Sequence, residues 1–255
     1  MPYPIFEKWK SNKPTVNIFL RIPSGFIAEL VSHTDLDAIT LDLQHGLVEL
    51  EHSLPMLQAM NKEKFPMARI AANDPAAIMK LLDIGAKGII CPMINTAAET
   101  EKFVQACYYP PVGVRSFGPI RANLPARSTY MQDYKNDIIT FAQIETRESL
   151  ENLEEIAAVK NLSGLYVGPY DLSISLGMTK MADFSDPTFM DHIKRVLAVA
   201  KKHNLITAIQ AYKEDEAAML ANMGFNMVTP IDESAVLLQG VKDKLERVKS
   251  KIQVK

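Results

Sequence analysis

The feature that most constrains the fold is an alternation of short apolar runs with longer amphipathic segments along the chain. Runs rich in Ile, Val, Phe and Leu favour strands, and each is followed by a segment whose apolar residues recur at helical spacing. The expected strands cover residues 15–22, 36–43, 66–71, 88–91, 138–144, 165–167, 205–210 and 227–229. The expected helices cover residues 26–32, 48–62, 75–84, 96–108, 148–158, 187–202, 214–223 and 233–250.

Eight strand–helix units favour an α/β fold of the closed (β/α)8 type, the TIM barrel. The 255 residues, 47% of them hydrophobic, suit one barrel domain, and no segment rich in Gly, Pro or Ser divides them. We therefore expect a single domain over residues 1–255. A doubly wound open sheet is the alternative, although the sequence contains neither a GxGxxG nor a GxxxxGK[ST] motif.

Composition excludes several classes of partner. The net charge of −2 provides no basic field for a nucleic acid, and Lys and Arg are scattered among Asp and Glu. The N-terminus lacks the layout of a signal peptide, and no apolar run reaches the about 18 residues that a membrane span needs. Cys91 and Cys107 lack CxxC spacing and are expected to be buried thiols in a reducing compartment. A soluble cytoplasmic protein without nucleic-acid or membrane partners is expected.

Two acidic residues fall where two neighbouring strands end. Residues 141–177 read as strand, helix, strand, with Glu145 directly after the first strand and Asp171 just past the second. Because the strands of a βαβ unit are parallel, both carboxylates are expected at the C-terminal edge, where α/β proteins build their sites. Two carboxylates suit a hard divalent ion such as Mg²⁺ or Mn²⁺. The alternative is that Glu145 caps a helix and Asp171 is a solvated loop acid.

Two other strand ends carry residues suited to proton transfer and charge stabilisation. His45 precedes Gly46, which permits a sharp turn, and histidine is the usual proton-transfer residue near neutral pH. A hydrogen-bonded structural histidine is the alternative. Arg69 lies in an otherwise apolar strand, so its guanidinium must meet an anion, either an internal acid or a bound ligand.

Taken together, these residues and their flanking segments resemble the HpcH/HpaI class II aldolase family of metal-dependent pyruvate aldolases. The resemblance runs from about residue 37 to 232 and depends on the order of its segments. These are LDLQHG (41–46), NDP (73–75) with LLDIGA (81–86), PMINT (92–96), YPPVGVR (109–115), QIET (143–146) and GPYDLS (168–173).

The resemblance implies reversible retro-aldol cleavage of a 4-hydroxy-2-oxo acid to pyruvate and an aldehyde. Substrates of the 4-hydroxy-2-oxoheptanedioate or 2-keto-3-deoxy sugar acid type are implied, which makes the chain a carbon–carbon lyase. Glu145 and Asp171 match the ligands of a divalent ion, which would be Mg²⁺, Mn²⁺ or Co²⁺. His45 matches the base, and Arg69 matches the arginine that stabilises the enolate.

The resemblance also implies substrate contacts and an assembly. Gln143, Tyr170 through its amide, and Asp171 match positions that bind the pyruvate moiety. Asp83 matches an acid that pairs with the histidine of another subunit, whereas from the residues alone it would be a surface acid. A homohexamer is implied, with the C-terminal helix exchanged between subunits and active sites at the interfaces.

Three positions depart from the family pattern and put the range of aldehydes in doubt. Gln44 stands where Glu is usual, Tyr170 stands where a small residue is common, and residues 229–231 replace a Gly-containing turn.

Other functions remain as alternatives. A Schiff-base aldolase would need a lysine at a strand end, and only Lys87 and Lys213 come near one. An acyl-CoA lyase of the citrate lyase β type would need a groove for the nucleotide, for which the basic residues are Arg115, Arg121 and Arg127 in the long connection 110–137. A barrel that binds a keto acid without converting it is the third alternative.

Overall fold

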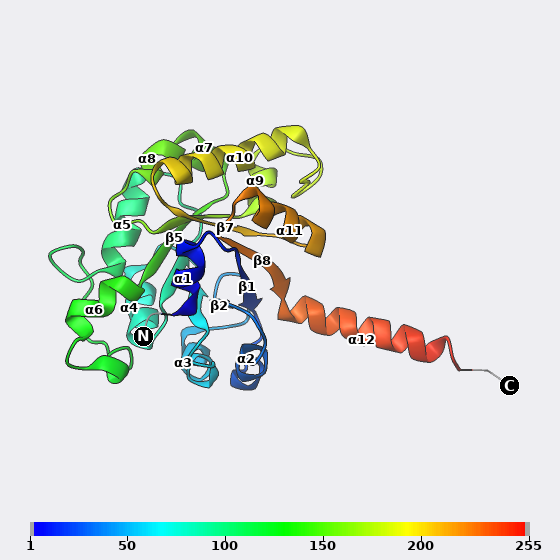
Figure 1. Ribbon diagram of the computed structural model, residues 1–255, viewed down its shortest axis with the longest axis horizontal. Helices are drawn as coiled ribbons and strands as arrows, with labels where there is room; N and C mark the ends of the chain where they lie inside the picture. The colour runs from blue at the N-terminus through cyan, green and yellow to red at the C-terminus, as the bar shows by residue number, and fades with distance from the viewer. Residues whose placement is uncertain (1–2, 253–255) are drawn as a thin grey trace.

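The computed structural model describes residues 3–252 and forms a closed barrel of eight parallel strands in sequence order, surrounded by helices (Figure 1). The strands are β1 (Thr15–Leu20), β2 (Ala38–Asp42), β3 (Phe65–Arg69), β4 (Gly88–Cys91), β5 (Ile139–Ile144), β6 (Gly164–Val167), β7 (Ile206–Gln210) and β8 (Met227–Asp232). The predicted (β/α)8 barrel is confirmed, and the open doubly wound sheet is wrong because β8 pairs with β1.

The helices that follow the strands lie close to their predicted bounds, except for the short helix at residues 169–175, for which no bounds were predicted. They are α2 (Gly25–Ser32), α3 (Leu50–Ala59), α4 (Pro75–Asp83), α5 (Ala97–Cys107), α7 (Arg147–Glu151), α8 (Leu153–Ala157), α9 (Pro169–Ser175), α10 (Pro187–Lys202), α11 (Glu214–Met223) and α12 (Glu233–Lys249). The predicted helix 148–158 is two short helices, because the backbone leaves helical geometry at Asn152. The Asn152 side chain instead donates to the carbonyl of Asn95 at 2.8 Å.

Local sequence signals set several helix ends. Asp74 accepts a hydrogen bond from the Ala76 amide, and Pro75 occupies the first helical position of α4. Thr96 and Glu99 form the predicted capping box at the start of α5. Gly85 has a φ of +110°, which allows the chain to leave α4 and enter β4.

Three further helices were not predicted from the sequence. Two of them, η1 (Leu124–Ala126) and α6 (Tyr130–Asp137), lie within the long connection between α5 and β5. The third, α1 (Pro4–Lys10), precedes the barrel.

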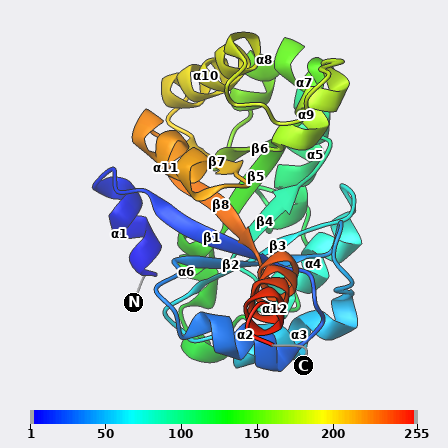
Figure 2. The ribbon, with the colours of Figure 1, turned by 90° about the vertical axis from the view of Figure 1, so that its right-hand side faces the viewer.

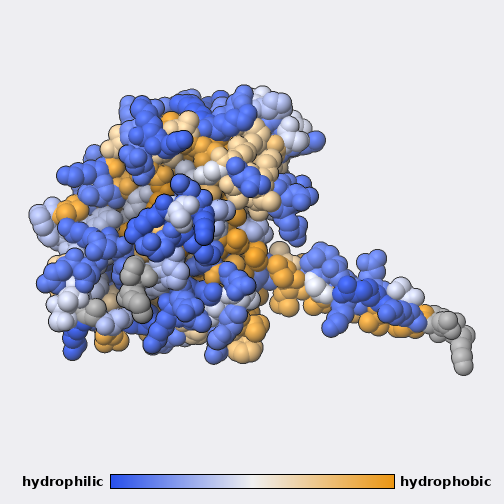
Figure 3. Space-filling view, viewed as in Figure 1, coloured by the Kyte–Doolittle hydropathy of each residue, from blue (hydrophilic) through white to orange (hydrophobic). Residues whose placement is uncertain are grey.

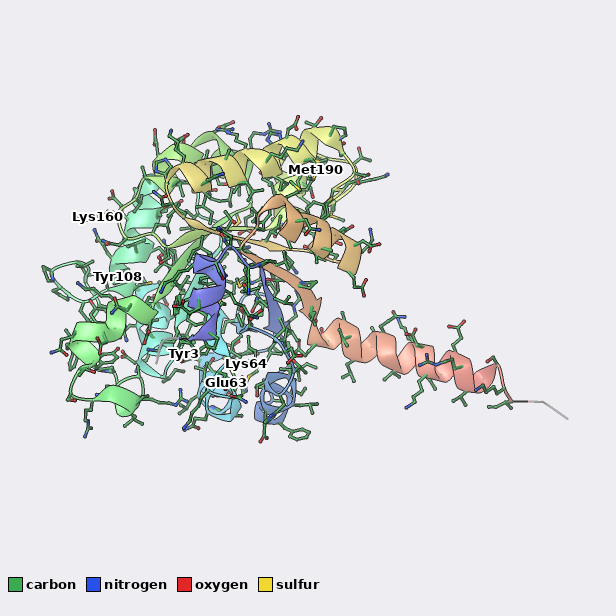
Figure 4. The ribbon with its side chains drawn as sticks, in the orientation of Figure 1. Tyr3, Glu63, Lys64, Tyr108, Lys160 and Met190 are labelled. Atoms are coloured by element: carbon green, nitrogen blue, oxygen red, sulfur yellow. The ribbon has the colours of Figure 1, made fainter. Side chains whose placement is uncertain are left out.

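An aromatic cluster closes the N-terminal end of the barrel. The rings of Tyr3, Phe6 and Trp9 each meet the ring of Phe65 edge-on, with centroids 5.2 to 6.4 Å apart. Phe65 begins β3, and Tyr3 is labelled beside α1 in Figure 4. Because α1 and the side chains inside the strands form one buried cluster, packed side chains fill this end of the barrel. The opposite end carries the loops that follow the strands.

The last helix, α12, extends away from the barrel (Figures 1 and 2). Glu233 is its only buried residue. Six apolar side chains are each at least 50% exposed, and these are Val236, Leu237, Leu238, Val241, Leu245 and Val248. Figure 3 shows apolar surface along this helix, and Figure 4 shows its side chains extending outward along its whole length. Within residues 3–252, no helix combines the length and apolarity that crossing a bilayer requires.

Candidate active site

The polar residues predicted at the strand ends lie at the C-terminal end of the barrel. Arg69 ends β3 and is the register partner of Asp42, which ends β2. Glu145 directly follows β5, and Asp171 lies in the first turn of α9, directly after β6. The expected location of the two predicted carboxylates is therefore confirmed.

Glu145 is a buried carboxylate held by neutral donors. It is 1% exposed. Its Oε1 accepts from the Met93 amide at 2.7 Å, and its Oε2 accepts from Nε2 of Gln143 at 2.5 Å. Burial raises the pKa of Glu145, and the charge of nearby Asp171 raises it further, although both donors and Arg69 oppose this shift. The alternative that Glu145 caps a helix is wrong, because Thr146 caps α7.

The backbone around Glu145 is shaped to receive it. Met93 adopts a φ of +54°, which a side chain larger than hydrogen disfavours, and in this conformation its amide reaches Glu145. A β-carbon on Gly168 would lie 2.5 Å from Oε2 of Glu145, so only glycine fits there. Three residues later the chain reaches Asp171, whose side chain is exposed.

Two groups beside Glu145 have unused hydrogen-bonding capacity. Oε1 of Gln143 and the hydroxyl of Tyr166 are buried and make no hydrogen bond with the described residues. Gln143 cannot satisfy both ends of its amide in either orientation, because Nε2 and Oε1 would only exchange places. Buried polar groups without partners are costly, so they mark a place where a polar ligand would be stabilised.

Arg69 meets an internal acid, which decides between the two anions left open by the sequence. Its Nε and Nη2 donate to the two carboxylate oxygens of Asp42 at 2.9 and 2.6 Å, and its guanidinium lies 4.3 Å from the centroid of the Phe19 ring. Both residues are buried. Its third nitrogen, Nη1, makes no hydrogen bond with the described residues and is therefore available to a ligand.

His45 lies in an exposed turn built on the same acid. The amides of Gln44 and His45 both donate to Oδ1 of Asp42 at 3.2 Å. A β-carbon on Gly46 would lie 2.3 Å from the carbonyl oxygen of Asp42, so the turn needs glycine there. The His45 ring is hydrogen-bonded to none of the residues that the structure describes, so the structural alternative lacks support.

Comparison with known proteins connects this arrangement with a family. The family model described as HpcH/HpaI aldolase/citrate lyase matches residues 16–230. The chain belongs to the HpcH/HpaI aldolase/citrate lyase family.

Individual relatives agree with the family. A hydroxypyruvate/pyruvate aldolase of Rhizorhabdus wittichii is 35% identical over 90% of this chain and 92% of its own length. A 4-hydroxy-2-oxo-heptane-1,7-dioate aldolase of Shigella flexneri is 33% identical over 66% of this chain and 64% of its own. The crystal structure of an HpcH/HpaI aldolase from Desulfitobacterium hafniense shares the fold, with a TM-score of 0.89 at 22% identity, over 99% of this chain and 98% of that one. The predicted family, the aldolase activity and the carbon–carbon lyase class are confirmed.

Asp83 differs from what the residues alone suggested. The expectation of a solvated surface acid is wrong, because Asp83 is buried at the end of α4 and pairs with Arg115 at 2.6 Å. The Arg115 guanidinium lies over the Tyr109 ring, 4.5 Å from its centroid. Oδ2 of Asp83 makes no hydrogen bond with the described residues. Because α4 returns toward the N-terminal end of the barrel, Asp83 lies far from the strand ends of its own chain.

The positions of the other cations argue against two alternative activities. Arg115 pairs with Asp83, and Arg121 donates to the carbonyls of Ile84 and Leu57. Two of the three arginines suggested for a nucleotide groove are therefore engaged in contacts within the protein. Lys87 precedes β4 and pairs with Asp137, which places it at the wrong end of its strand for a Schiff base. Lys213 is exposed and pairs with Glu216.

Two residues of the site were missed by sequence reasoning. Asp42 appeared only as part of the LDLQHG segment, although it joins Arg69 to the His45 turn. Arg21 was assigned no role, yet its Nε donates to Oδ2 of Asp42 at 3.2 Å. One signal in the sequence could have identified them. Asp42 ends a strand beside Arg69 of the next strand, and Arg21 follows a strand whose neighbour ends in Asp42.

The Asp42 carboxylate should make the protein sensitive to acid. Burial alone would raise the pKa of Asp42, but hydrogen bonds and charge from Arg69, the His45 amide and Arg21 hold it below its ordinary value of 3.8. A lowered pKa in the folded state contributes stability that is complete above the unfolded pKa and is lost as pH falls through the folded pKa. Asp42→Asn should lower the free energy of unfolding at pH 7 by about 3–5 kcal/mol, because Arg69 stays buried without its partner.

Urea denaturation as a function of pH tests this. The difference between the parental protein and Asp42→Asn should shrink as pH falls below 3.8. Asp191→Asn, which removes an exposed ion pair on α10, should change the free energy by less than about 1 kcal/mol. A difference for Asp42→Asn that stays constant with pH would contradict the assigned interaction.

Proposed function

We propose that this chain is a divalent-metal-dependent aldolase that reversibly cleaves 4-hydroxy-2-oxo acids to pyruvate and an aldehyde. The observation that carries the proposal is Glu145, a buried acid at the barrel mouth whose hydrogen bonds come from neutral donors. The aldolase relatives support the substrate class. One of them is named hydroxypyruvate/pyruvate aldolase, and its similarity extends over 90% of this chain.

The donor set fits a hard divalent ion. Glu145 and Asp171 would hold it, and Mg²⁺ or Mn²⁺ accepts two carboxylates while keeping its other positions for oxygen ligands. Within residues 3–252, no group of three His, Cys, Asp or Glu side chains is arranged around a metal position, which disfavours a closed zinc site. When bound, such an ion supplies Lewis-acid stabilisation of the negative charge that the keto acid acquires on cleavage.

The remaining chemistry is assigned to the chain's own residues. His45 would accept the proton of the 4-hydroxyl group, after which the C3–C4 bond breaks and the aldehyde leaves. The electron pair of that bond stays on the pyruvate fragment as an enolate, toward which Arg69 would donate through its free Nη1. Return of the proton from His45 to C3 of the enolate then gives pyruvate. Gln143 and the Tyr170 amide are proposed to contact the pyruvate moiety. One N–H of Gln143 Nε2 meets Glu145, and its second N–H would donate to an oxygen of the keto acid.

Replacing Glu145 by Gln should abolish both metal binding and turnover. Mn²⁺ should raise the melting temperature of the parental protein, because it binds only the folded site, but should leave that of Glu145→Gln unchanged. Pyruvate release from a 4-hydroxy-2-oxo acid should require Mn²⁺ and stop in EDTA. His45→Ala is the matched control, since it should keep the thermal response and lose turnover. Pyruvate release that persists in EDTA would refute the metal proposal.

We also propose that the protein assembles into a homo-oligomer, a hexamer by family resemblance, in which α12 packs on another barrel. No part of the chain within residues 3–252 covers the exposed apolar side chains of α12. Helix α2 also carries Phe26 and Leu30, which are 70% and 59% exposed. Exposed apolar side chains gathered along one helix are typical of an interface. In such an assembly Asp83 would approach His45 of another copy.

Complementation between two inactive variants tests a shared site. His45→Ala and Asp83→Asn should each be slow alone, because each spoils every site. After co-refolding, about a quarter of the sites in random oligomers would join a native His45 to a native Asp83, so activity should return. Adding Val241→Glu and Leu245→Glu to both chains should abolish this recovery and yield monomers by light scattering, whereas Gln239→Glu on the opposite face should not. No recovery from correctly assembled mixtures would show that the site lies within one chain.

Tyr170 is proposed to limit the size of the aldehyde. The rings of Tyr170 and Tyr212 meet edge-on with their centroids 4.2 Å apart, and we call this pair the aromatic wall. Asp171 directly follows Tyr170 in the chain. Tyr170 lies just after β6 and Tyr212 lies two residues after β7, so the pair stands at the C-terminal end of the barrel, where Glu145 and Arg69 lie.

Tyr170→Ala should therefore increase kcat/KM for bulky aldehydes about tenfold relative to small ones, with little change in KM for pyruvate. Ile174→Ala removes an exposed side chain of the same helix and should leave the ratio unchanged. Initial rates of the aldol reaction with a graded series of aldehydes measure it. An unchanged ratio for Tyr170→Ala would contradict the wall.

A further inference from the structure

Arg21 joins three separate elements at the mouth of the barrel. It directly follows β1, and its side chain is 30% exposed. Its Nε donates to Oδ2 of Asp42 at 3.2 Å, and its Nη1 forms an ion pair with Asp232, the last residue of β8. A single guanidinium therefore bridges the acid that holds Arg69 and the acid from which α12 begins.

The backbone of Arg21 is fixed as firmly as its side chain. Its amide donates to Oε1 of Glu233 at 2.6 Å, and its carbonyl accepts from the Leu47 amide at 2.8 Å. A β-carbon on Gly46 would lie only 2.8 Å from Cα of Arg21, so the turn that carries His45 lies directly against this residue. The turn, the end of β1 and the first residue of α12 thus form one packed unit.

The charges around Arg21 show which role it can take. The two nitrogens that form ion pairs are engaged by carboxylates of the protein, and Asp42 and Asp232 balance the charges of Arg21 and Arg69. Arg21 therefore directs its charge to two carboxylates of the protein. The fork of the guanidinium instead suits a link between two fixed carboxylates, which a lysine ammonium on a flexible stem cannot reproduce.

We infer that Arg21 is a positioning residue for the proposed reaction, and that it ties the first turn of α12 to His45 and Arg69 through Asp42. Asp42 donates no proton and contacts no substrate in this scheme. It sets where the Arg69 guanidinium and the His45 turn lie, and Arg21 holds Asp42 from the side opposite Arg69. Because misplacement of a catalytic group by about 1 Å costs up to about a hundredfold in rate, loosening this link should reduce turnover.

Two conservative variants test the inference, which rests on the proposed aldolase activity. Arg21→Lys keeps the charge but cannot bridge both acids. Asp232→Asn removes the charge that Arg21 meets, yet its Oδ1 can still accept from the Ser234 and Ala235 amides that cap α12. Asp186→Asn is the matched control, because Asp186 caps α10 through the Thr188 and Phe189 amides in the same way.

We expect kcat for pyruvate release to fall about tenfold in Arg21→Lys and in Asp232→Asn, with unchanged KM for the keto acid and an unchanged rise of melting temperature with Mn²⁺. Asp186→Asn should retain the parental kcat. The Arg21→Lys/Asp232→Asn double variant should be no slower than the slower single variant, because both changes break one link.

The outcomes separate this inference from the proposed function. A parental protein that releases no pyruvate with Mn²⁺ refutes the proposed function. An active parental protein whose two variants keep kcat within about twofold refutes the positioning role, even if their melting temperatures fall. A rise in KM at constant kcat also refutes it, because Arg21 would then contact the substrate. Additive losses in the double variant would show that Arg21 and Asp232 act independently.

Discussion

The arrangement at the barrel mouth depends on one buried carboxylate, that of Asp42. It is fully buried, and such a group stays ionised only when its oxygens are well supplied with donors. Arg69 provides two of these donors, the turn that carries His45 provides two amides, and Arg21 provides one. The same contacts that keep Asp42 charged therefore determine where the neighbouring groups lie, so its charge and the geometry of the site cannot be changed separately.

Glu145 is the counterpart of Asp42, and the difference between their partners explains the difference in chemistry. Cations that are hydrogen-bonded to Asp42 lower its pKa. Burial raises the pKa of Glu145, whose hydrogen-bond donors are neutral and on which the Arg69 charge acts without a hydrogen bond. A buried acid served by an amide and a neutral side chain is costly to the folded protein. Functional sites retain such costs when a ligand repays them on binding, which is why we assign Glu145 rather than Asp42 to the metal.

The sequence predicted the barrel well because its signals are local. Helical and strand periodicities, the Thr96 capping box and the Asp74–Pro75 start all act within a few residues. The ion pairs of the site were not predictable in this way. Asp42 meets Arg69 only through strand register, and Asp83 meets Arg115 across 32 positions of the sequence. The direction in which α12 leaves the barrel could not be predicted either. The same apolar spacing is expected whether the helix packs on its own barrel or on another.

The aromatic cluster at the N-terminal end of the barrel joins segments that are far apart in the sequence, which affects when it can form during folding. Nε1 of Trp9 donates to the carbonyl of Asn226, which lies 217 positions later and directly before β8. Helix α1 cannot complete this contact until the eighth strand has entered the sheet. Contacts between such distant positions form slowly, because a long loop must close first. During synthesis on a ribosome the contact between Trp9 and Asn226 would therefore form only after β8 has emerged, and its formation would report that the barrel has closed.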